Sequence, residues 1–316
     1  MDKKILCTVP LKDFPETCEI MNRNNFVTYL EYPNYNDVLR IINNFDGLFP
    51  NAKMSIDKKL IDNASKLKVI SMPGMGTDHI DMKYCSEKGV KVFSLSDAKD
   101  FMSTIPSTAE YTVGLILSLL KKYHHSMKSV VEDNLWLTSK FRGFNLKNKI
   151  VGIIGYGVIG KQVSNMLKVF DAKVIVNDPY LNNSDYNINF VTIETLLKNS
   201  EIITVHVPLN DETKNLIDRN NFSLMNQTYF INASRGGVID DSALIWALEA
   251  GKVKAAALDV LTDESNLNFE SNVLIQYAKN NDNLIITPHC AGSSFDGLKR
   301  IFKYSAEILI KNLLEN

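Results

Sequence analysis

The sequence predicts an α/β protein that is built from two doubly wound parallel sheets. Short β-branched strands alternate with helical stretches over most of the 316 residues. A glycine-rich turn near the middle of the chain follows a strand and opens a helix, which is typical of a nucleotide-binding unit. The C-terminal stretch holds one amphipathic helix, too little for a separate domain, so we expect it to pack on the N-terminal domain.

A strand–turn–helix–strand unit is the centre of this organisation. Lys149–Ile154 is apolar and β-branched, as expected of a strand that is covered on both faces. An amphipathic helix and a second strand, Lys173–Val176, come later and lead to Asp178. Between the first strand and the helix stands a G-x-G-x-x-G turn, Gly155-Tyr156-Gly157-Val158-Ile159-Gly160.

Each part of this unit has a physical reason to bind a dinucleotide. The first glycine permits the tight turn, the second lets the backbone approach a pyrophosphate, and the third lets helix and strand pack closely. The helix N-terminus adds N–H groups that face the anion. Asp178 stands 23 residues after Gly155 (178 − 155), where a carboxylate accepts hydrogen bonds from a ribose and repels a 2′-phosphate. The unit therefore predicts a Rossmann domain that binds NAD rather than NADP.

Composition and charge argue against several other classes of protein. Hydrophobic residues make up 45% and charged residues 22% of the chain, which is typical of a soluble globular protein. The net charge of −1 gives no basis for a nucleic-acid or membrane partner. The N-terminus lacks the apolar segment of a signal peptide, and the four cysteines show no metal-ligand spacing. We therefore expect a cytoplasmic protein with no metal.

The N-terminal part of the chain predicts a second sheet. Helical stretches such as Tyr35–Asn44 and Leu60–Leu67 separate its strands, which is the alternation of a parallel, flavodoxin-like sheet. No G-x-G-x-x-G occurs here, so we interpret this part as the substrate domain. The predicted strands are Ile5–Val9, Phe26–Tyr29, Gly47–Phe49, Lys68–Met72 and Val90–Ser94.

Two stretches of this domain are candidates for substrate contacts. The turn Gly74-Met75-Gly76 follows a strand, and its consecutive N–H groups are suited to an anion such as a substrate carboxylate. The alternative, a tight strand-to-helix turn without a ligand, stays open. Lys53 follows another strand, where it either neutralises a phosphate or second carboxylate of the substrate or is a solvated surface residue.

A long helix is predicted from Ser107 to about Ser129. It is apolar on nearly every side and must be buried on several faces, between the domains, against a second subunit, or both. We favour both, and therefore expect a homodimer. Six strands, counting the two of the central unit, complete the nucleotide-binding sheet. We place the NAD-binding domain at residues 99–288 and the substrate domain at residues 1–98 plus 289–316.

Polar side chains follow several strands of the nucleotide-binding sheet, and in an open α/β sheet ligands bind beyond the carboxyl ends of the strands. We therefore expect these side chains to converge on the rim that carries the glycine turn. In chain order they are His206, Asn232, Ser234, Arg235, Asp259, Glu264 and His289.

His289 is the candidate proton donor among the five histidines. It lies on the loop at the predicted domain junction, where an imidazole can give a proton to a carbonyl near neutral pH. A carboxylate partner such as Glu264 would favour the imidazolium. Arg235 could grip a carboxylate and polarise the carbonyl beside it. His206 ends an apolar strand and is interpreted as a packing residue or a backbone contact to the cofactor.

These features together resemble the D-isomer-specific 2-hydroxyacid dehydrogenase family. The matching segments cover most of the chain and keep the family's order. They are SMPGMGTDHID (71–81), STAEYTVGLILSLL (107–120), KIVGIIGYGVIG (149–160), VNDP (176–179), HVPLNDET (206–213), INASRGGVID (231–240), AALDV (256–260) and TPHCAG (287–292).

The resemblance implies an NAD-dependent oxidoreductase that interconverts a 2-ketoacid and a D-2-hydroxy acid. It implies a catalytic trio in which His289 protonates the ketone oxygen while NADH delivers hydride, Glu264 supports His289, and Arg235 binds substrate. It also implies that Asp259 orients the nicotinamide and that Gly74-Met75-Gly76 binds the substrate carboxylate. The further cofactor contacts that it implies, besides the glycine turn, Asp178, Arg235 and His289, are His206, Val207, Pro208, Thr213, Ala233, Ser234 and Gly292.

Two positions depart from the family's pattern. Ser265 follows Glu264, where the family usually has proline, so Asp263 is a rival to Glu264 as the partner of His289. Thr104 stands where many relatives have asparagine. Phosphoglycerate, glyoxylate or hydroxypyruvate, lactate and a sugar-acid phosphate stay open as substrates. The alternative function is a dinucleotide-sensing binding protein, since some relatives act as transcriptional corepressors.

Overall fold

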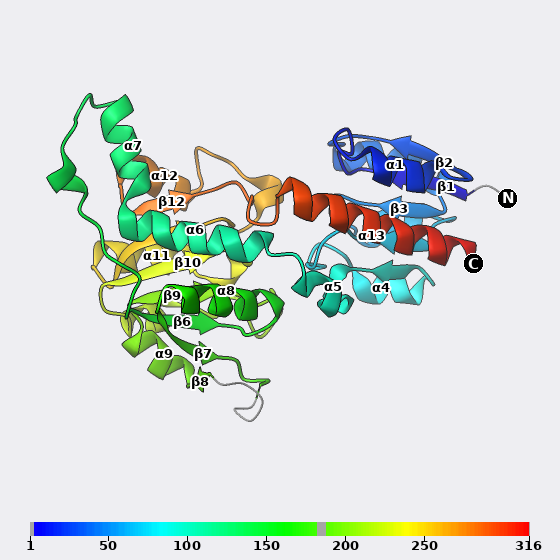
Figure 1. Ribbon diagram of the computed structural model, residues 1–316. Helices are drawn as coiled ribbons and strands as arrows, with labels where there is room; N and C mark the ends of the chain where they lie inside the picture. The colour runs from blue at the N-terminus through cyan, green and yellow to red at the C-terminus, as the bar shows by residue number, and fades with distance from the viewer. Residues whose placement is uncertain (1–2, 182–187, 316) are drawn as a thin grey trace. The chain divides into compact units, whose positions relative to one another are not determined.

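The computed structural model describes residues 3–181 and 188–315 of the chain. Two compact units make it up: Met1–Thr104 with Phe295–Asn316 form unit 1, and Ile105–Ser294 form unit 2. The boundaries between the two units lie after Thr104 and Ser294, whereas the sequence predicts them after residues 98 and 288. Each unit is a parallel sheet with helices on its faces, as Figure 1 shows, so the predicted α/β class is confirmed.

Unit 1 contains a five-stranded sheet in the order β2-β1-β3-β4-β5, with every pairing parallel. This order reverses direction at β1 and β3, as in flavodoxin-like folds, and confirms that part of the prediction. The strands are β1 (Lys3–Cys7), β2 (Asn25–Tyr29), β3 (Gly47–Phe49), β4 (Val69–Ser71) and β5 (Lys91–Phe93).

Helices cover both faces of this sheet. On one face, apolar residues of α2, α3 and α4 pack with the strands around Leu48 and Ile70. On the other face, α13 contacts α1, β3 and β4, and Ser71 Oγ donates to Ser305 O at 2.7 Å. The C-terminal helix thus belongs to unit 1, as its sequence predicts. The helices are α1 (Pro15–Asn22), α2 (Tyr35–Ile41), α3 (Lys58–Asn63), α4 (Met82–Glu87), α5 (Lys99–Ser103) and α13 (Phe295–Leu314).

Unit 2 contains a seven-stranded parallel sheet in the order β12-β11-β10-β9-β6-β7-β8. The prediction of six strands is wrong by one, because the two residues of β8 are too few to show any alternation. The order reverses between β6 and β9, which is the switch point of a Rossmann sheet. The strands are β6 (Ile150–Ile154), β7 (Lys173–Asn177), β8 (Asn189–Phe190), β9 (Ile202–Val205), β10 (Thr228–Asn232), β11 (Val253–Leu258) and β12 (Leu284–Ile286).

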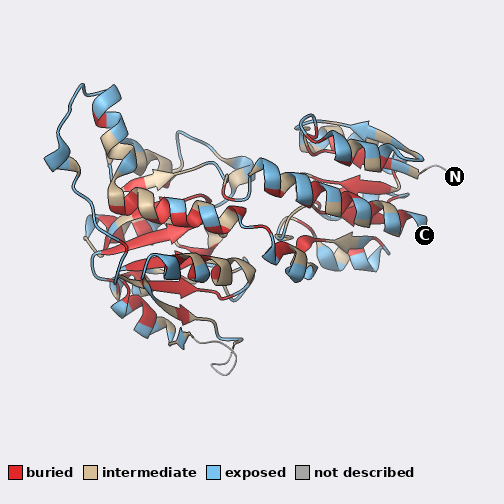
Figure 2. Ribbon diagram, viewed as in Figure 1, coloured by how far each residue is buried: buried red, intermediate tan, exposed pale blue. Residues whose placement is uncertain are grey.

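Two apolar layers enclose this sheet, and its central strands β6, β9 and β10 are buried (Figure 2). The layer with α6 and α8 includes Ile116 and Leu167, and the opposite layer includes Phe222 and Leu244. The helices are α6 (Ser107–Lys121), α7 (Tyr123–Val131), α8 (Val158–Val169), α9 (Ile193–Asn199), α10 (Arg219–Ser223), α11 (Asp241–Glu249) and α12 (Val273–Asn280). Short 3₁₀ helices span Ile42–Asn44, Leu95–Asp97, Thr138–Phe141, Gly236–Val238 and Glu264–Asn266.

The long helix that the sequence predicts over residues 107–129 is two helices. Lys122 takes a left-handed conformation with φ of 55°, which ends α6 and lets α7 start in a new direction. α6 is largely buried, whereas Met127, Val131 and Trp136 are exposed beyond the break. Within residues 3–181 and 188–315, no helix combines the length and apolar character needed to cross a bilayer.

Candidate active site

The glycine turn between β6 and α8 is shaped for a pyrophosphate. Gly155 has φ of 90°, and a Cβ there would lie 2.5 Å from His206 O. A Cβ on Gly160 would lie 2.2 Å from Gly155 O, so only glycine lets the helix pack this closely. A Cβ on Gly157 would meet open space. The turn therefore leaves room at the N-terminus of α8, opened by Val158 and Ile159, where an anion is favoured.

Asp178 is fixed beside this turn by backbone donors. Its Oδ2 accepts the N–H of Tyr156, inside the glycine turn, at 2.8 Å, and its Oδ1 accepts the N–H of Tyr180 at 3.0 Å. Each carboxylate oxygen keeps a second lone pair, so the side chain can still accept hydrogen bonds from ribose hydroxyls. The carboxylate is thus held beside the glycine turn, and its contact with an adenosine ribose stays a prediction.

The loop after β9 forms the other side of the switch point. His206 is half-buried, its Nε2 lies 2.9 Å from Thr204 Oγ1, and burial lowers its pKa to about 3. The imidazole is therefore neutral at physiological pH. Val207 lies against Gly155, and Thr213 Oγ1 donates to Pro208 O at 2.6 Å, which folds the loop back on itself.

The turn after β10 carries Arg235 and is held by one buried amide. Asn232 Oδ1 accepts the N–H and the hydroxyl of Ser234, at 3.0 and 2.7 Å, and its Nδ2 donates to Arg235 O at 2.9 Å. Ala233 is buried between them, and Arg235 Nη1 donates to Ser234 O at 2.9 Å. The buried Asn232 side chain therefore holds the backbone on both sides of this turn in place.

The next residue locks this turn to the loop after β11. A Cβ on Gly236 would lie 2.0 Å from the carbonyl carbon of Leu261, so the two backbones are in direct contact. Leu261 N in turn donates to Glu264 Oε1 at 3.0 Å. The position of Glu264 thus depends on the turn that carries Arg235.

His289 pairs with Glu264. Its Nδ1 lies 2.7 Å from Glu264 Oε2, and the side chains are 36% and 24% exposed. This leaves Nε2 as the ring nitrogen to meet a substrate. Asp263 turns elsewhere, because its Oδ1 accepts Ser265 Oγ at 3.2 Å and Asn266 Nδ2 at 3.0 Å. Of the two rival acids, Glu264 is the one in contact with the imidazole.

Asp259 has a role that sequence reasoning missed. Its carboxylate is fully buried and accepts three donors of the loop after β12: the Thr287 hydroxyl at 2.5 Å, Cys290 N at 2.9 Å and Ala291 N at 2.7 Å. Its carbonyl accepts His289 N at 2.8 Å, and His289 has φ of 58°. Asp259 thus holds the loop in the left-handed conformation that presents His289.

No local signal marks this arrangement, because the partners of Asp259 come from a different strand. The exposed Gly292 ends the same loop, and a Cβ there would lie 3.7 Å from Thr108 Oγ1, in ordinary contact. Arg235, Asp259, Glu264 and His289 all lie at the rim of unit 2, as the sequence predicts.

The remaining candidates belong to unit 1. Gly74 N donates to Met72 O at 2.9 Å, so that donor of the predicted anion turn is already used. The N–H groups of Met75 and Gly76 find no acceptor in the described part of the chain, and Met75 is 36% exposed. Lys53 is exposed in the turn after β3. The turn therefore offers two adjacent donors, from Met75 and Gly76, to an anion.

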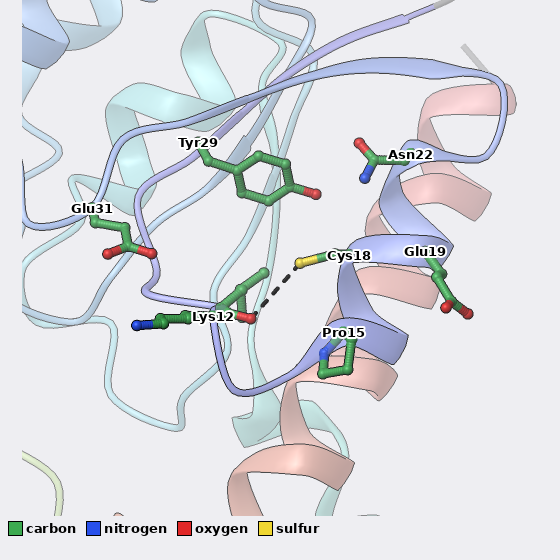
Figure 3. A pocket seen from close by; sticks show the side chains of 8 residues that line it. Lys12, Pro15, Cys18, Glu19, Asn22, Tyr29 and Glu31 are labelled. Atoms are coloured by element: carbon green, nitrogen blue, oxygen red, sulfur yellow. Dashed lines mark hydrogen bonds between the residues drawn. The ribbon is translucent and has the colours of Figure 1, made fainter.

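Unit 1 also has a pocket of about 480 Å³ between α1 and β2 (Figure 3). Tyr29 and Cys18 face each other across it, and Lys12 and Glu31 lie at its other end. None of the predicted site residues lines this pocket. Its lining residues are Leu11, Lys12, Pro15, Cys18, Glu19, Asn22, Tyr29 and Glu31.

Known proteins resemble this chain over most of its length. The sequence profile of the D-isomer specific 2-hydroxyacid dehydrogenase NAD-binding domain matches residues 113–291. A hydroxypyruvate reductase from Thermotoga maritima is 30% identical over 93% of this chain and 93% of its own length. A D-3-phosphoglycerate dehydrogenase from Methanocaldococcus jannaschii is 34% identical over 98% of this chain but only 57% of its own length. This chain thus spans little more than half of that relative.

Solved structures show the same architecture. A D-lactate dehydrogenase from Aquifex aeolicus, in complex with NAD and lactic acid, superposes with a TM-score of 0.84 at 27% identity. The superposition covers 99% of this chain and 96% of that one. The profile, the relatives and the rim of unit 2 lead to one conclusion. The chain belongs to the D-isomer specific 2-hydroxyacid dehydrogenases, and residues 113–291 match the family's NAD-binding domain.

Proposed function

We propose that this chain reduces a 2-ketoacid to a D-2-hydroxy acid with NADH, using His289 as the general acid. The observation that carries the proposal is the His289–Glu264 pair, 2.7 Å apart, on the rim that holds the glycine turn. In the reverse direction the same imidazole takes the proton from the hydroxyl. NADH, when bound, supplies the hydride; the chain's own residues supply charge, orientation and the proton.

The groups at the rim divide this work. Glu264 Oε2 lies beside His289 Nδ1, so Nε2 is the ring nitrogen that gives a proton to the ketone oxygen. Arg235 attracts the substrate carboxylate and stabilises the negative charge that grows on the oxygen. Asp259 keeps the His289 loop in place through its three donors. After the transfer the imidazole is neutral and its proton is on the product.

The N–H groups of Met75 and Gly76 are our proposed site for the substrate carboxylate. Two consecutive donors without an acceptor in the described residues are suited to one carboxylate group. We propose that Lys53 selects substrates with a second anionic group, because its side chain is exposed and carries a positive charge. Substrates with and without a phosphate therefore need to be compared directly.

Loss of NADH absorbance with a panel of 2-ketoacids tests this proposal. The panel holds glyoxylate, hydroxypyruvate, pyruvate, oxaloacetate, 2-ketoglutarate and phosphohydroxypyruvate. We expect turnover with at least one acid, formation of the D-enantiomer, and loss of turnover in His289→Ala. Tight NADH binding without any turnover would favour the alternative, a dinucleotide-sensing binding protein; none of the comparisons supports that alternative.

We also propose that the protein is a cytoplasmic homodimer. Exposed apolar side chains gather on α7 and the segment after it: Tyr123, Met127, Val130, Val131, Leu135, Trp136, Leu137 and Phe144. A second copy of the same surface would cover them in a two-fold arrangement. Light scattering should then give a mass of about twice 35.6 kDa, and Trp136→Asp together with Met127→Asp should shift it towards the monomer. A monomeric wild type would contradict the dimer.

A further inference from the structure

A tyrosine and a glutamate bridge two loops beside the glycine turn. The strand order β9-β6-β7 places the loops after β7 and β9 on either side of the turn that follows β6. Tyr180 lies in the first of these loops and Glu212 in the second, and the Tyr180 hydroxyl donates a hydrogen bond to Glu212 Oε2. Both side chains are exposed. The bridge therefore lies at the edge of the proposed adenosine site.

The bridge is continuous with the carboxylate of Asp178. Asp178 accepts Tyr180 N at 3.0 Å with one oxygen and Tyr156 N at 2.8 Å with the other. On the other side, Glu212 N donates to Asn210 Oδ1 at 3.0 Å, which fixes the start of that side chain. The hydrogen bond to Glu212 and the charges of Glu212 and Asp178 raise the pKa of Tyr180. Both carboxylates thus act on the same phenol.

We propose that Glu212 is a second acid, alongside Asp178, that makes the enzyme select NAD over NADP. This inference rests on the proposed function, because it needs a dinucleotide at the glycine turn. A 2′-phosphate brings close to two negative charges to the ribose edge, where Asp178 already stands. Glu212 is linked to Asp178 through Tyr180, which bonds to both carboxylates. Its negative charge would also repel the 2′-phosphate, over the Debye length of about 10 Å at 0.1 M salt.

Two conservative changes separate the charge from the bridge. Glu212→Gln removes the charge and keeps an oxygen that can accept the Tyr180 hydroxyl. Tyr180→Phe removes the bridge and keeps the charge. If the charge decides selectivity, only the first change matters. Asp211→Asn is the matched control, because Asp211 is an exposed acid in the same loop and none of the described hydrogen bonds joins it to Tyr180.

The test measures Kd for NADH and NADPH with the full chain, by fluorescence of the bound nicotinamide. We expect Glu212→Gln to tighten NADPH binding about fivefold and to leave NADH within about twofold, which is the effect of one charge at this range. The gain should shrink in high salt. Tyr180→Phe and Asp211→Asn should keep the wild-type ratio of the two constants, and Asp178→Asn with Glu212→Gln should exceed either alone.

Three outcomes would overturn the proposal: an unchanged ratio in Glu212→Gln, an equal change in Asp211→Asn, or an equal change in Tyr180→Phe. The last would show that the bridge, and not the charge, excludes NADPH. A wild type that binds neither dinucleotide would fail differently, since it would refute the proposed function itself. Circular dichroism of each variant verifies that the fold is retained.

Discussion

The turn after β10 and the loop after β11 both bring a reactive side chain to the rim of unit 2, but they are held in different ways. The first, with Arg235, is anchored by the buried Asn232 side chain, whose amide makes three hydrogen bonds. The second, with Glu264, is mostly exposed and rests on surface contacts of Thr262 and Asp263. A buried side chain therefore fixes the position of Arg235, whereas the position of Glu264 depends on contact between its loop and the neighbouring turn.

Gly236 is the residue at which the turn after β10 contacts the loop after β11. We expect Gly236→Ala to have the largest effect on activity and stability. The added Cβ would lie 2.0 Å from the Leu261 carbonyl carbon, so the loop must move and Glu264 with it. We expect kcat to fall about 100-fold and the free energy of unfolding to fall by on the order of 3 kcal/mol.

Steady-state kinetics and denaturant unfolding measure both quantities. Gly237→Ala is the control, because its Cβ would meet only the side-chain end of Leu209 at 3.2 Å. Its kcat should stay within about threefold of wild type. Equal losses in both variants would refute the interlock between the turn and the loop.

Glu264→Gln should have the next largest effect and sharpens the contrast inside the loop. The amide keeps the shape of the side chain but removes the negative charge beside His289 Nδ1. We expect kcat to fall between about 10- and 100-fold, with the Kd of NADH unchanged, because only the proton donor is affected. Asp263→Asn changes the neighbouring acid, whose partners are Ser265 and Asn266. It should retain most activity, and the opposite ranking would make Asp263 the working acid.

Asp241 should give the smallest effect, on stability and its pH dependence. Burial raises the pKa of this carboxyl, which accepts the Thr262 hydroxyl at 3.3 Å, to about 6. Because the pKa is higher in the folded than in the unfolded state, the protonated carboxyl contributes fully to stability below about pH 4. This contribution is lost as the pH rises through about 6.

Asp241→Asn removes this ionisation and keeps an oxygen for Thr262. It should raise the free energy of unfolding by about 1 kcal/mol at pH 8 and change it little at pH 4. The effect is no larger because solvent screens this partly exposed site. Denaturant unfolding at the two pH values measures the difference. Stabilisation at pH 4 alone would reverse the sign and refute the burial argument.

The sequence predicts best where structure is local. The glycine turn, its flanking strands and Asp178 are encoded within one continuous stretch, and each residue has its own steric or electrostatic reason. The break at Lys122 is missed because apolar residues continue up to it and lysine gives no sign of a left-handed conformation. The strand β8 is missed because two residues carry no periodicity.

In the candidate site, sequence identifies residue types and structure decides their pairing. Asp263 and Glu264 are adjacent acids, and only the loop conformation shows which one reaches His289. Asp259 is predicted to face the cofactor, yet its carboxylate accepts hydrogen bonds from Thr287, Cys290 and Ala291 in the loop after β12. Such long-range contacts leave no mark on either segment by itself.

The return of the C-terminal helix to unit 1 has a consequence for synthesis on the ribosome. Residues 105–294 of unit 2 are continuous and can complete their sheet as soon as they emerge. β3 and β4 of unit 1 precede unit 2 in the sequence, but α13, which covers one of their faces, is synthesised only after unit 2. Domains that begin a chain usually fold first. Here unit 2 can fold first, and the nascent sheet of unit 1 exposes an apolar face until α13 has been synthesised.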